Sequence, residues 1–191
     1  MRKIILASQS KARQKLLKQI GIRFQVARSD IRERQKLGGS CADLVIKNAL
    51  EKAKDVAKRF DSGVVIAADT IVLAGRKIIG KPKNLKDASQ TLKLLSQKPQ
   101  WIYTGIAIVD IDNGMVFTDS EKTKICMYPL TDRQIRNYFR KVSPLDKSGS
   151  FDIQGLGGMF IERIEGCFYN VVGLPLAKLA KLLRKAGIDV F

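Results

Sequence analysis

The spacing of hydrophobic residues along the chain predicts alternating strands and helices. A continuous apolar run at Ile4–Leu6 and the longer, mainly apolar stretch Val64–Leu73 are typical of buried strands. The other expected strands cover residues 77–79, 102–109, 115–127 and 159–164. Apolar residues at helical spacing follow the polar caps Ser10, Ser40, Asn84 and Thr131, and a last expected helix covers Leu176–Lys185.

Because strands and helices interleave, and several strands are joined by short turns, the pattern predicts an α/β fold. The sheet is expected to be mixed and partly antiparallel, with helices flanking it. No linker, repeat or low-complexity tract interrupts the pattern, so we expect a single domain over residues 1–191.

Composition excludes several classes of chemistry. The chain of 191 residues contains no histidine, which removes serine–histidine and cysteine–histidine catalysis and every histidine-ligated metal site. Its three cysteines (Cys41, Cys126 and Cys167) are far apart, so we expect buried free thiols in a reducing cytosol. The longest apolar run, Val64–Ala68, is far shorter than the roughly 20 residues that span a bilayer. We therefore expect a soluble, cytoplasmic protein without a membrane partner.

The charge balance is strongly positive and uneven. The chain has 35 Lys and Arg against 18 Asp and Glu, and its first 60 residues hold 16 of the former against 5 of the latter. Such a field suits a polyanion: nucleic acid, an anionic membrane surface or a phosphorylated small molecule. A solvated basic surface explains the same numbers, so charge alone does not choose between these alternatives.

Polar residues next to the first expected helix form a candidate phosphate site. Ser8, Ser10 and Arg13 lie between the strand 4–6 and this helix. A helix N-terminus offers free N–H groups and partial positive charge, and an arginine adds a bidentate donor. An N-cap serine beside a surface arginine would give the same pattern.

Two charged residues interrupt apolar surfaces. Lys52 lies between Ala49 and Val56 on the apolar stripe of its helix, so its ammonium either extends to solvent or points into an anion-binding site. Asp69 follows five apolar residues in an expected central strand. An ionised carboxylate there needs a partner, either a basic side chain or a divalent cation.

Two further patterns resemble known motifs but depart from them. Gly75 and Gly80-Lys81 have P-loop spacing, but Pro82 follows and supplies neither a hydroxyl nor an N–H group. A P-loop is therefore rejected, although Lys81 can still contact a phosphate. Asp110 and Asp112 resemble the start of a calcium loop, but the next glycine is misplaced for one and the flanks read as strands. We interpret this segment as a hairpin turn.

Together these residues supply the groups needed for metal-assisted hydrolysis of a phosphoanhydride. Basic and hydroxyl side chains can bind the phosphate groups. Asp69 and an acidic partner such as Glu33 can hold a divalent cation. The candidate phosphate-binding residues are Ser8, Ser10, Arg13, Lys52 and Lys81. Because no activated serine or cysteine is available, water is the expected nucleophile.

Several motifs in order along nearly the whole chain resemble the Maf (septum formation) family of nucleoside triphosphate pyrophosphatases. They are Leu6-Ala7-Ser8-Gln9-Ser10, Ala67-Ala68-Asp69-Thr70, Gly80-Lys81-Pro82, Tyr103-Thr104-Gly105, Pro144-Leu145-Asp146-Lys147, Ile153-Gln154-Gly155-Leu156-Gly157-Gly158 and Asn170-Val171-Val172-Gly173-Leu174-Pro175.

The resemblance implies hydrolysis of a nucleoside triphosphate to the monophosphate and pyrophosphate with Mg2+ or Mn2+. It implies a fold related to inosine triphosphate pyrophosphatases, with two lobes around a cleft. By position, Asp69 would be the proton acceptor or a metal ligand, and Glu33 would lie on the metal side. Ser8, Arg13, Lys52 and Lys81 would lie on the phosphate side.

The resemblance also bears on substrate choice. In the subfamily that acts on dTTP and UTP, selectivity is associated with an arginine before the matched Arg13, a threonine after the aspartate and a glutamine in the glycine-rich loop. Thr70 and Gln154 match, whereas Ala12 stands in place of the arginine. We therefore expect a pyrimidine triphosphate, with CTP or a modified base as further candidates.

Three alternatives stay open at this point. The first is 7-methyl-GTP, the substrate of the sister subfamily. The second is a basic nucleic-acid-binding regulator of division without catalysis, although no nucleic-acid motif is present. The third is a degenerate, non-catalytic member of the family. A homodimer is also left open.

Overall fold

The computed structural model describes residues 2–34, 39–145 and 147–190. The chain divides into two compact units. The first unit comprises residues 1–70, 104–121 and 172–191, and the second comprises residues 71–103 and 122–171. The Asp146 position of the expected Pro144–Lys147 motif lies outside the described residues.

Within the described residues the strands form one seven-stranded sheet, in the order β2-β1-β3-β5-β6-β7, with β4 paired to β3. The strands are β1 (Ile4–Leu6), β2 (Gln25–Val26), β3 (Val64–Ala74), β4 (Lys77–Ile79), β5 (Gln100–Asp110), β6 (Met115–Met127) and β7 (Ile161–Glu165). β1 pairs in parallel with β2 and β3, whereas β4 and β7 pair antiparallel with β3 and β6. The expected mixed α/β sheet is therefore confirmed.

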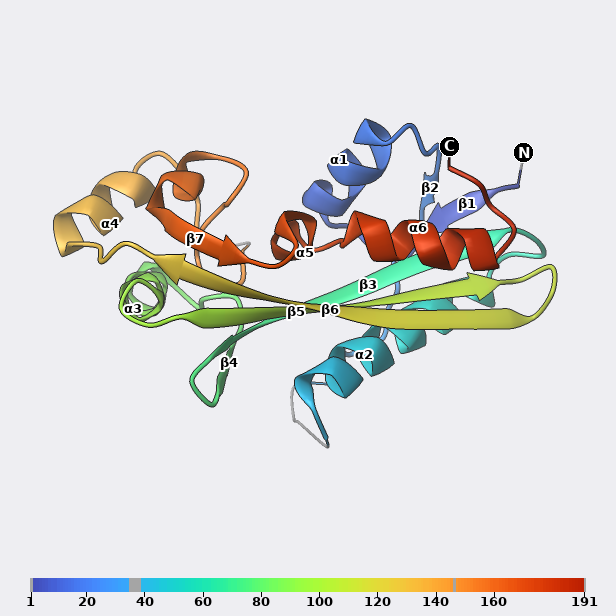
Figure 1. Ribbon diagram of the computed structural model, residues 1–191, viewed down its shortest axis with the longest axis horizontal. Helices are drawn as coiled ribbons and strands as arrows, with labels where there is room; N and C mark the ends of the chain where they lie inside the picture. Colours follow the sequence, from blue (N-terminus) through green and yellow to red (C-terminus); the bar gives the residue numbers. More distant parts are fainter. Residues whose placement is uncertain (1, 35–38, 146, 191) are drawn as a thin grey trace. The chain divides into compact units, whose positions relative to one another are not determined.

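In the first unit, helices cover both faces of the sheet (Figure 1). α2 (Cys41–Ala57) lies on one face, and α1 (Lys11–Gln19) and α6 (Leu176–Lys185) lie on the other. Successive side chains of a strand point to opposite faces. Val65 and Ala67 accordingly pack with α2, while Ile66 and Ala68 pack with α1 and α6.

The second unit has its own core. α3 (Leu85–Leu95) contacts α4 (Asp132–Phe139), and apolar residues of both helices pack with the ends of β5 and β6. A short 3-10 helix, η1 (Leu156–Phe160), precedes β7, and α5 (Phe168–Val172) follows it.

The helix starts lie where the polar caps predict them. The side chains of Ser10, Ser40, Asn84 and Thr131 each accept a hydrogen bond from a backbone N–H group three residues on. The capping boxes at Ser40 and Thr131 are complete, with Asp43 and Gln134 returning the bond.

The sequence pattern missed three short elements, β2, η1 and α5. Each has two to five residues, and none contains a continuous apolar run like that of β1. The strand expected over 159–164 begins later, at Ile161, because residues 156–160 form η1.

The turn at Asp110 and Asp112 is confirmed, and the expected burial of the cysteines is corrected. The segment around Asp110 and Asp112 is the turn between β5 and β6, and both carboxylates bind Arg2. The three cysteines are free, but they are half-buried rather than buried, so that part of the expectation is wrong. In the described part of the chain, no helix combines the length and apolarity needed to cross a bilayer.

A close approach between α2 and β5 sets the position of the helix in the first unit. A Cβ atom on Gly105 would lie 2.3 Å from the backbone carbonyl carbon of Val45. Only glycine therefore allows α2 to lie this near the strand. Asn48 and Lys52 follow Val45 by one and two turns of α2, and both contact Asp69 on β3.

Candidate active site

The candidate site lies at the carboxyl end of β1, where the order of strands reverses. The chain passes from β1 through α1 to β2 on one side, then returns through α2 to β3 on the other side of β1. Open α/β sheets bind ligands outside the carboxyl ends of strands at such a reversal. The pairing of β1 with β3 ends at Ile66, so the Asp69 and Thr70 positions of β3 extend past the end of β1.

On the α2 side of β3, two carboxylates converge on one ammonium group. The Lys52 Nζ atom lies 2.7 Å from the Asp69 Oδ1 atom and 2.6 Å from the Glu33 Oε1 atom. The Asp69 side chain is 6% exposed and that of Lys52 is 10% exposed, whereas the Glu33 side chain is 56% exposed. Lys52 therefore points into the site, one of the two outcomes that its place on the apolar stripe allows.

Asn48, one turn before Lys52 on α2, completes this group. Its Nδ2 atom donates to the Asp69 Oδ2 atom at 2.8 Å, so both carboxylate oxygens of Asp69 have a partner. Sequence reasoning missed Asn48. The available signal was a polar side chain four residues before Lys52, on the same apolar face of the helix.

On the α1 side of β3, Arg13 organises a second group. Its guanidinium donates to the carbonyl oxygen of Gly173 at 2.8 Å, to the Ser8 Oγ atom at 3.2 Å and to the Thr70 Oγ1 atom at 2.9 Å. Thr70 Oγ1 also lies 2.9 Å from the hydroxyl of Thr104. Thr104 belongs to the Tyr103-Thr104-Gly105 motif but was not among the candidate site residues predicted from the sequence.

The environment of Arg13 favours an added anion. Burial lowers the pKa of the guanidinium from its ordinary value, and the charges of Asp69 and Glu33 oppose that shift. The three bonds of Arg13 go to uncharged oxygens, so among the described residues no carboxylate in contact with it cancels its charge. Ser10 caps α1 by accepting from the backbone N–H of Arg13, and the first turn of a helix leaves further N–H groups without a partner inside the helix.

The remaining candidate residues fall in different places. Ala12 is half-buried on α1, next to Arg13. Lys81 and Gln154 are exposed residues of the second unit, after β4 and before η1 respectively. That Lys81 and Gln154 approach the residues around Asp69 and Arg13 stays a prediction, and so does the expected cleft between two lobes.

Glu33 and Asp69 can supply two of the ligands that a hard divalent cation needs. Glu33 and Asp69 already face the same cationic group, which is the arrangement that two carboxylate ligands need. Across residues 2–34, 39–145 and 147–190, no group of three acidic, cysteine or histidine side chains could hold a metal. Mg2+ is commonly held by one or two carboxylates, with substrate phosphates and water as its other ligands. The two carboxylates fit that mode.

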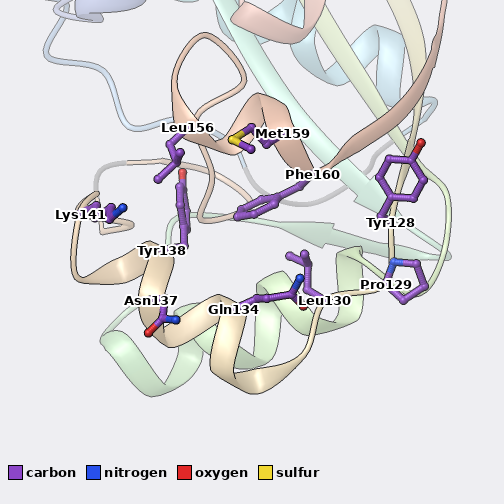
Figure 2. A pocket seen from close by; sticks show the side chains of 10 residues that line it. All are labelled: Tyr128, Pro129, Leu130, Gln134, Asn137, Tyr138, Lys141, Leu156, Met159 and Phe160. Atoms are coloured by element: carbon purple, nitrogen blue, oxygen red, sulfur yellow. The ribbon is translucent and has the colours of Figure 1, made fainter.

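A separate pocket in the second unit contains none of the candidate residues. It has a volume of about 430 Å³ and lies between α4 and η1 (Figure 2). Its lining side chains are mostly apolar: Tyr128, Pro129, Leu130, Gln134, Asn137, Tyr138, Lys141, Leu156, Met159 and Phe160. With no carboxylate and one basic side chain, it lacks the groups that the chemistry expected from the sequence requires.

Comparison with known proteins identifies the family. A family model described as Maf-like protein matches residues 3–186. A dTTP/UTP pyrophosphatase of Methanosarcina barkeri is 46% identical over 192 residues, covering 100% of this chain and 98% of the relative. A dTTP/UTP pyrophosphatase of Bacillus anthracis is 42% identical over 190 residues, with the same coverage.

A solved structure supports the expected fold. The Staphylococcus aureus Ham1 protein superposes with a TM-score of 0.51 over 96% of this chain and 99% of that one, at 19% identity. That likeness concerns the fold alone. The family model and the full-length relatives show that the chain belongs to the Maf family.

Proposed function

We propose that this protein hydrolyses a nucleoside triphosphate to the monophosphate and pyrophosphate, with dTTP and UTP as its substrates. Full-length relatives that carry the name dTTP/UTP pyrophosphatase support the proposal. The observation that carries it is the pairing of two groups at one end of β1. Two carboxylates share the Lys52 ammonium on one face of β3, and the Arg13 guanidinium, which donates to uncharged oxygens, lies on the other.

The Arg13 group is suited to the triphosphate. A guanidinium presents paired N–H donors that match phosphate oxygens, and Ser8 and Thr70 already hold this one in a fixed orientation. The first turn of α1 adds backbone N–H groups. Lys81 is proposed to approach the leaving pyrophosphate from the second unit.

The Asp69 group is suited to the reacting phosphorus. Asp69 and Glu33 would hold Mg2+ or Mn2+, which when bound would polarise a phosphoryl oxygen and activate water. A bond forms between the oxygen of water and the α-phosphorus while the bridging bond to the β-phosphate breaks and pyrophosphate leaves. An ionised Asp69 serves as acceptor of the proton from water or as a metal ligand, and both roles need the same carboxylate.

Base selectivity is proposed to involve Gln154 and the residues around Arg13. The amide of Gln154 is exposed and has donors and acceptors that can match the edge of a pyrimidine. The hydroxyl of Thr70 is engaged by Arg13 and Thr104, so Thr70 would act by holding Arg13. With Ala12 in place of an arginine, discrimination among pyrimidines is expected to be relaxed.

The test is pyrophosphate release from dTTP, UTP, CTP, 5-methyl-UTP and 7-methyl-GTP, each with Mg2+ or Mn2+. We expect turnover of the pyrimidine triphosphates, with nucleoside monophosphate and pyrophosphate as the products. A preference for 7-methyl-GTP would keep the reaction and overturn the substrate assignment. No turnover of any member of the panel would contradict the proposed function.

A further inference from the structure

Asn48 is a buried amide in the interior of α2, where packing alone would select an apolar residue. Its residue exposure is 1%, and its neighbours along the helix face include Val45, Ala49 and Ala53. Asparagine is a poor helix former, and burying an amide is costly unless its hydrogen bonds are made. Its bonding partners therefore indicate why the position is polar.

The amide of Asn48 uses its polar atoms on two different segments. The Oδ1 atom accepts from the backbone N–H of Arg34 at 3.0 Å, and the Nδ2 atom donates to the carbonyl oxygen of Arg34 at 3.1 Å. The second N–H of Nδ2 points to Asp69 Oδ2 at 2.8 Å. An ionised carboxylate only accepts hydrogen bonds, so the nitrogen must face Asp69 and the orientation of the amide is fixed.

The residue that Asn48 holds by its backbone directly follows Glu33. One amide thus connects the main chain beside Glu33 to the carboxylate of Asp69, while Lys52 connects the two acidic side chains by charge.

Other side chains on α2, or just after its end, hold this segment without touching Asp69. Asp55 accepts from the N–H group of Asp30, Arg59 donates to the carbonyl oxygen of Arg28, and Glu51 pairs with the Arg34 side chain. These contacts fix the course of the segment along the helix. Asn48 and Lys52 differ from them in that each also contacts Asp69 on β3.

We propose that Asn48 is a positioning residue, which sets the separation of the Glu33 and Asp69 carboxylates and so shapes their cation site. The inference rests on the proposed function. Partners that orient metal-binding carboxylates typically contribute about 10–100-fold to metal affinity or activity. Removing the amide should therefore weaken metal binding and slow turnover, while nucleotide binding through Arg13 is retained.

The experiment compares Asn48→Leu, which is similar in size but cannot hydrogen bond, with the smaller Asn48→Ser and with the control Glu51→Gln. Glu51→Gln loosens the Arg34 side chain from the same helix but does not involve Asp69. The readouts are kcat, KM for dTTP, and Mn2+ affinity. Mn2+ affinity is measured by electron paramagnetic resonance with a dTTP analogue that has a carbon bridge between the α- and β-phosphorus atoms. Circular dichroism restricts the comparison to conditions in which each variant is folded.

For the folded Asn48 variants we expect kcat and Mn2+ affinity to fall about 10–100-fold with KM for dTTP within about threefold of wild type. Glu51→Gln should stay within about threefold on all three readouts, as expected for an exposed ion pair. An active wild type whose Asn48 variants keep wild-type kcat and Mn2+ affinity would overturn this inference alone. A wild type that neither turns over the panel nor binds Mn2+ would overturn the proposed function, and this inference with it.

Discussion

Lys52 is the residue that most directly reflects the chemistry of the site. A buried ammonium with two carboxylate partners indicates a place where charge is concentrated, and the apolar stripe around it made that place visible in the sequence. Lys52→Met should lower the free energy of unfolding by about 3–5 kcal/mol, because Asp69 would be left buried without its cationic partner.

Urea denaturation measures this effect, and the double variant Lys52→Met/Asp69→Asn provides the control. It removes both charges and should recover part of the lost stability. A loss below about 1 kcal/mol in the single variant would show that the pair is no stronger than an ordinary surface ion pair.

Arg13 provides a second prediction at this scale. Arg13→Lys keeps the charge but cannot donate to Ser8, Thr70 and Gly173 together, because an ammonium lacks the planar fork of donors. We expect KM for dTTP to rise at least about tenfold, which corresponds to roughly 1.4 kcal/mol of binding free energy. Steady-state kinetics measure this change, and an unchanged KM would show that Arg13 does not bind the triphosphate.

Single residues also show where sequence reasoning ends. Asp69 and Lys52 could be found because each is charged in an apolar run, and Arg13 because it follows a strand and a serine cap. Asn48 carried a weaker signal, since an uncharged polar residue on a helix face has many explanations. Thr104 was part of the Tyr103-Thr104-Gly105 motif, but a threonine in a strand is ordinary, and only its contact with Thr70 places it in the candidate site.

At the scale of elements, the placement of α2 decides whether the site forms. α2 brings Asn48 and Lys52 to β3, and its approach to β5 at Gly105 leaves no room for a methyl group. Gly105→Ala should therefore destabilise the protein by about 1–3 kcal/mol through overpacking and should also lower turnover.

Thermal or urea unfolding tests this expectation against Gly80→Ala, where an added Cβ meets nothing within 4 Å. The control should change stability by no more than about 0.5 kcal/mol. Equal stability of the two variants would mean that α2 can shift without cost.

Elements with strong local signals could be predicted from the sequence. The caps at Ser40 and Thr131 and the apolar run beginning at Val64 each fix a boundary through local chemistry. β2 could not be predicted, because its two exposed residues become a strand only by pairing with β1. The reversal of strand order at β1, which makes the site, likewise depends on pairings between distant segments.

At the scale of the whole molecule, two predictions are confirmed: the family, from several ordered motifs, and the mixed α/β fold, from the alternation of strands and helices. The excess of basic residues is consistent with a polyanionic substrate. Part of it serves structure instead, because Arg2 joins the turn between β5 and β6 to the end of α6 through Asp110, Asp112 and the carbonyl oxygen of Ala186.

This Arg2 contact predicts a pH-dependent contribution to stability. Hydrogen bonds from Arg2 hold the pKa of both Asp110 and Asp112 below their usual range. A carboxyl group with a lowered pKa in the folded state stabilises the protein above its ordinary pKa of about 3.9, and that contribution is lost as the pH falls through the lowered value. Arg2→Met should therefore lower the free energy of unfolding at pH 7, and the loss should become progressively smaller in more acidic solution.

Urea denaturation from pH 7 to pH 2 provides the measurement, with the exposed Lys98→Met as the control for a lost positive charge. A cost of Arg2→Met that stays constant over this range would show that the two carboxylates do not carry the effect.

The central claim is that residues at the carboxyl end of β1 catalyse the attack of water on the α-phosphorus of a nucleoside triphosphate. The most direct test is hydrolysis of dTTP in ¹⁸O-labelled water by the wild-type protein and by Asp69→Asn. We predict that the label appears in the monophosphate, that pyrophosphate is unlabelled, and that the variant is slower by about 10²–10⁴-fold. Label in the pyrophosphate, or an Asp69→Asn protein with wild-type turnover at saturating metal, would contradict the account.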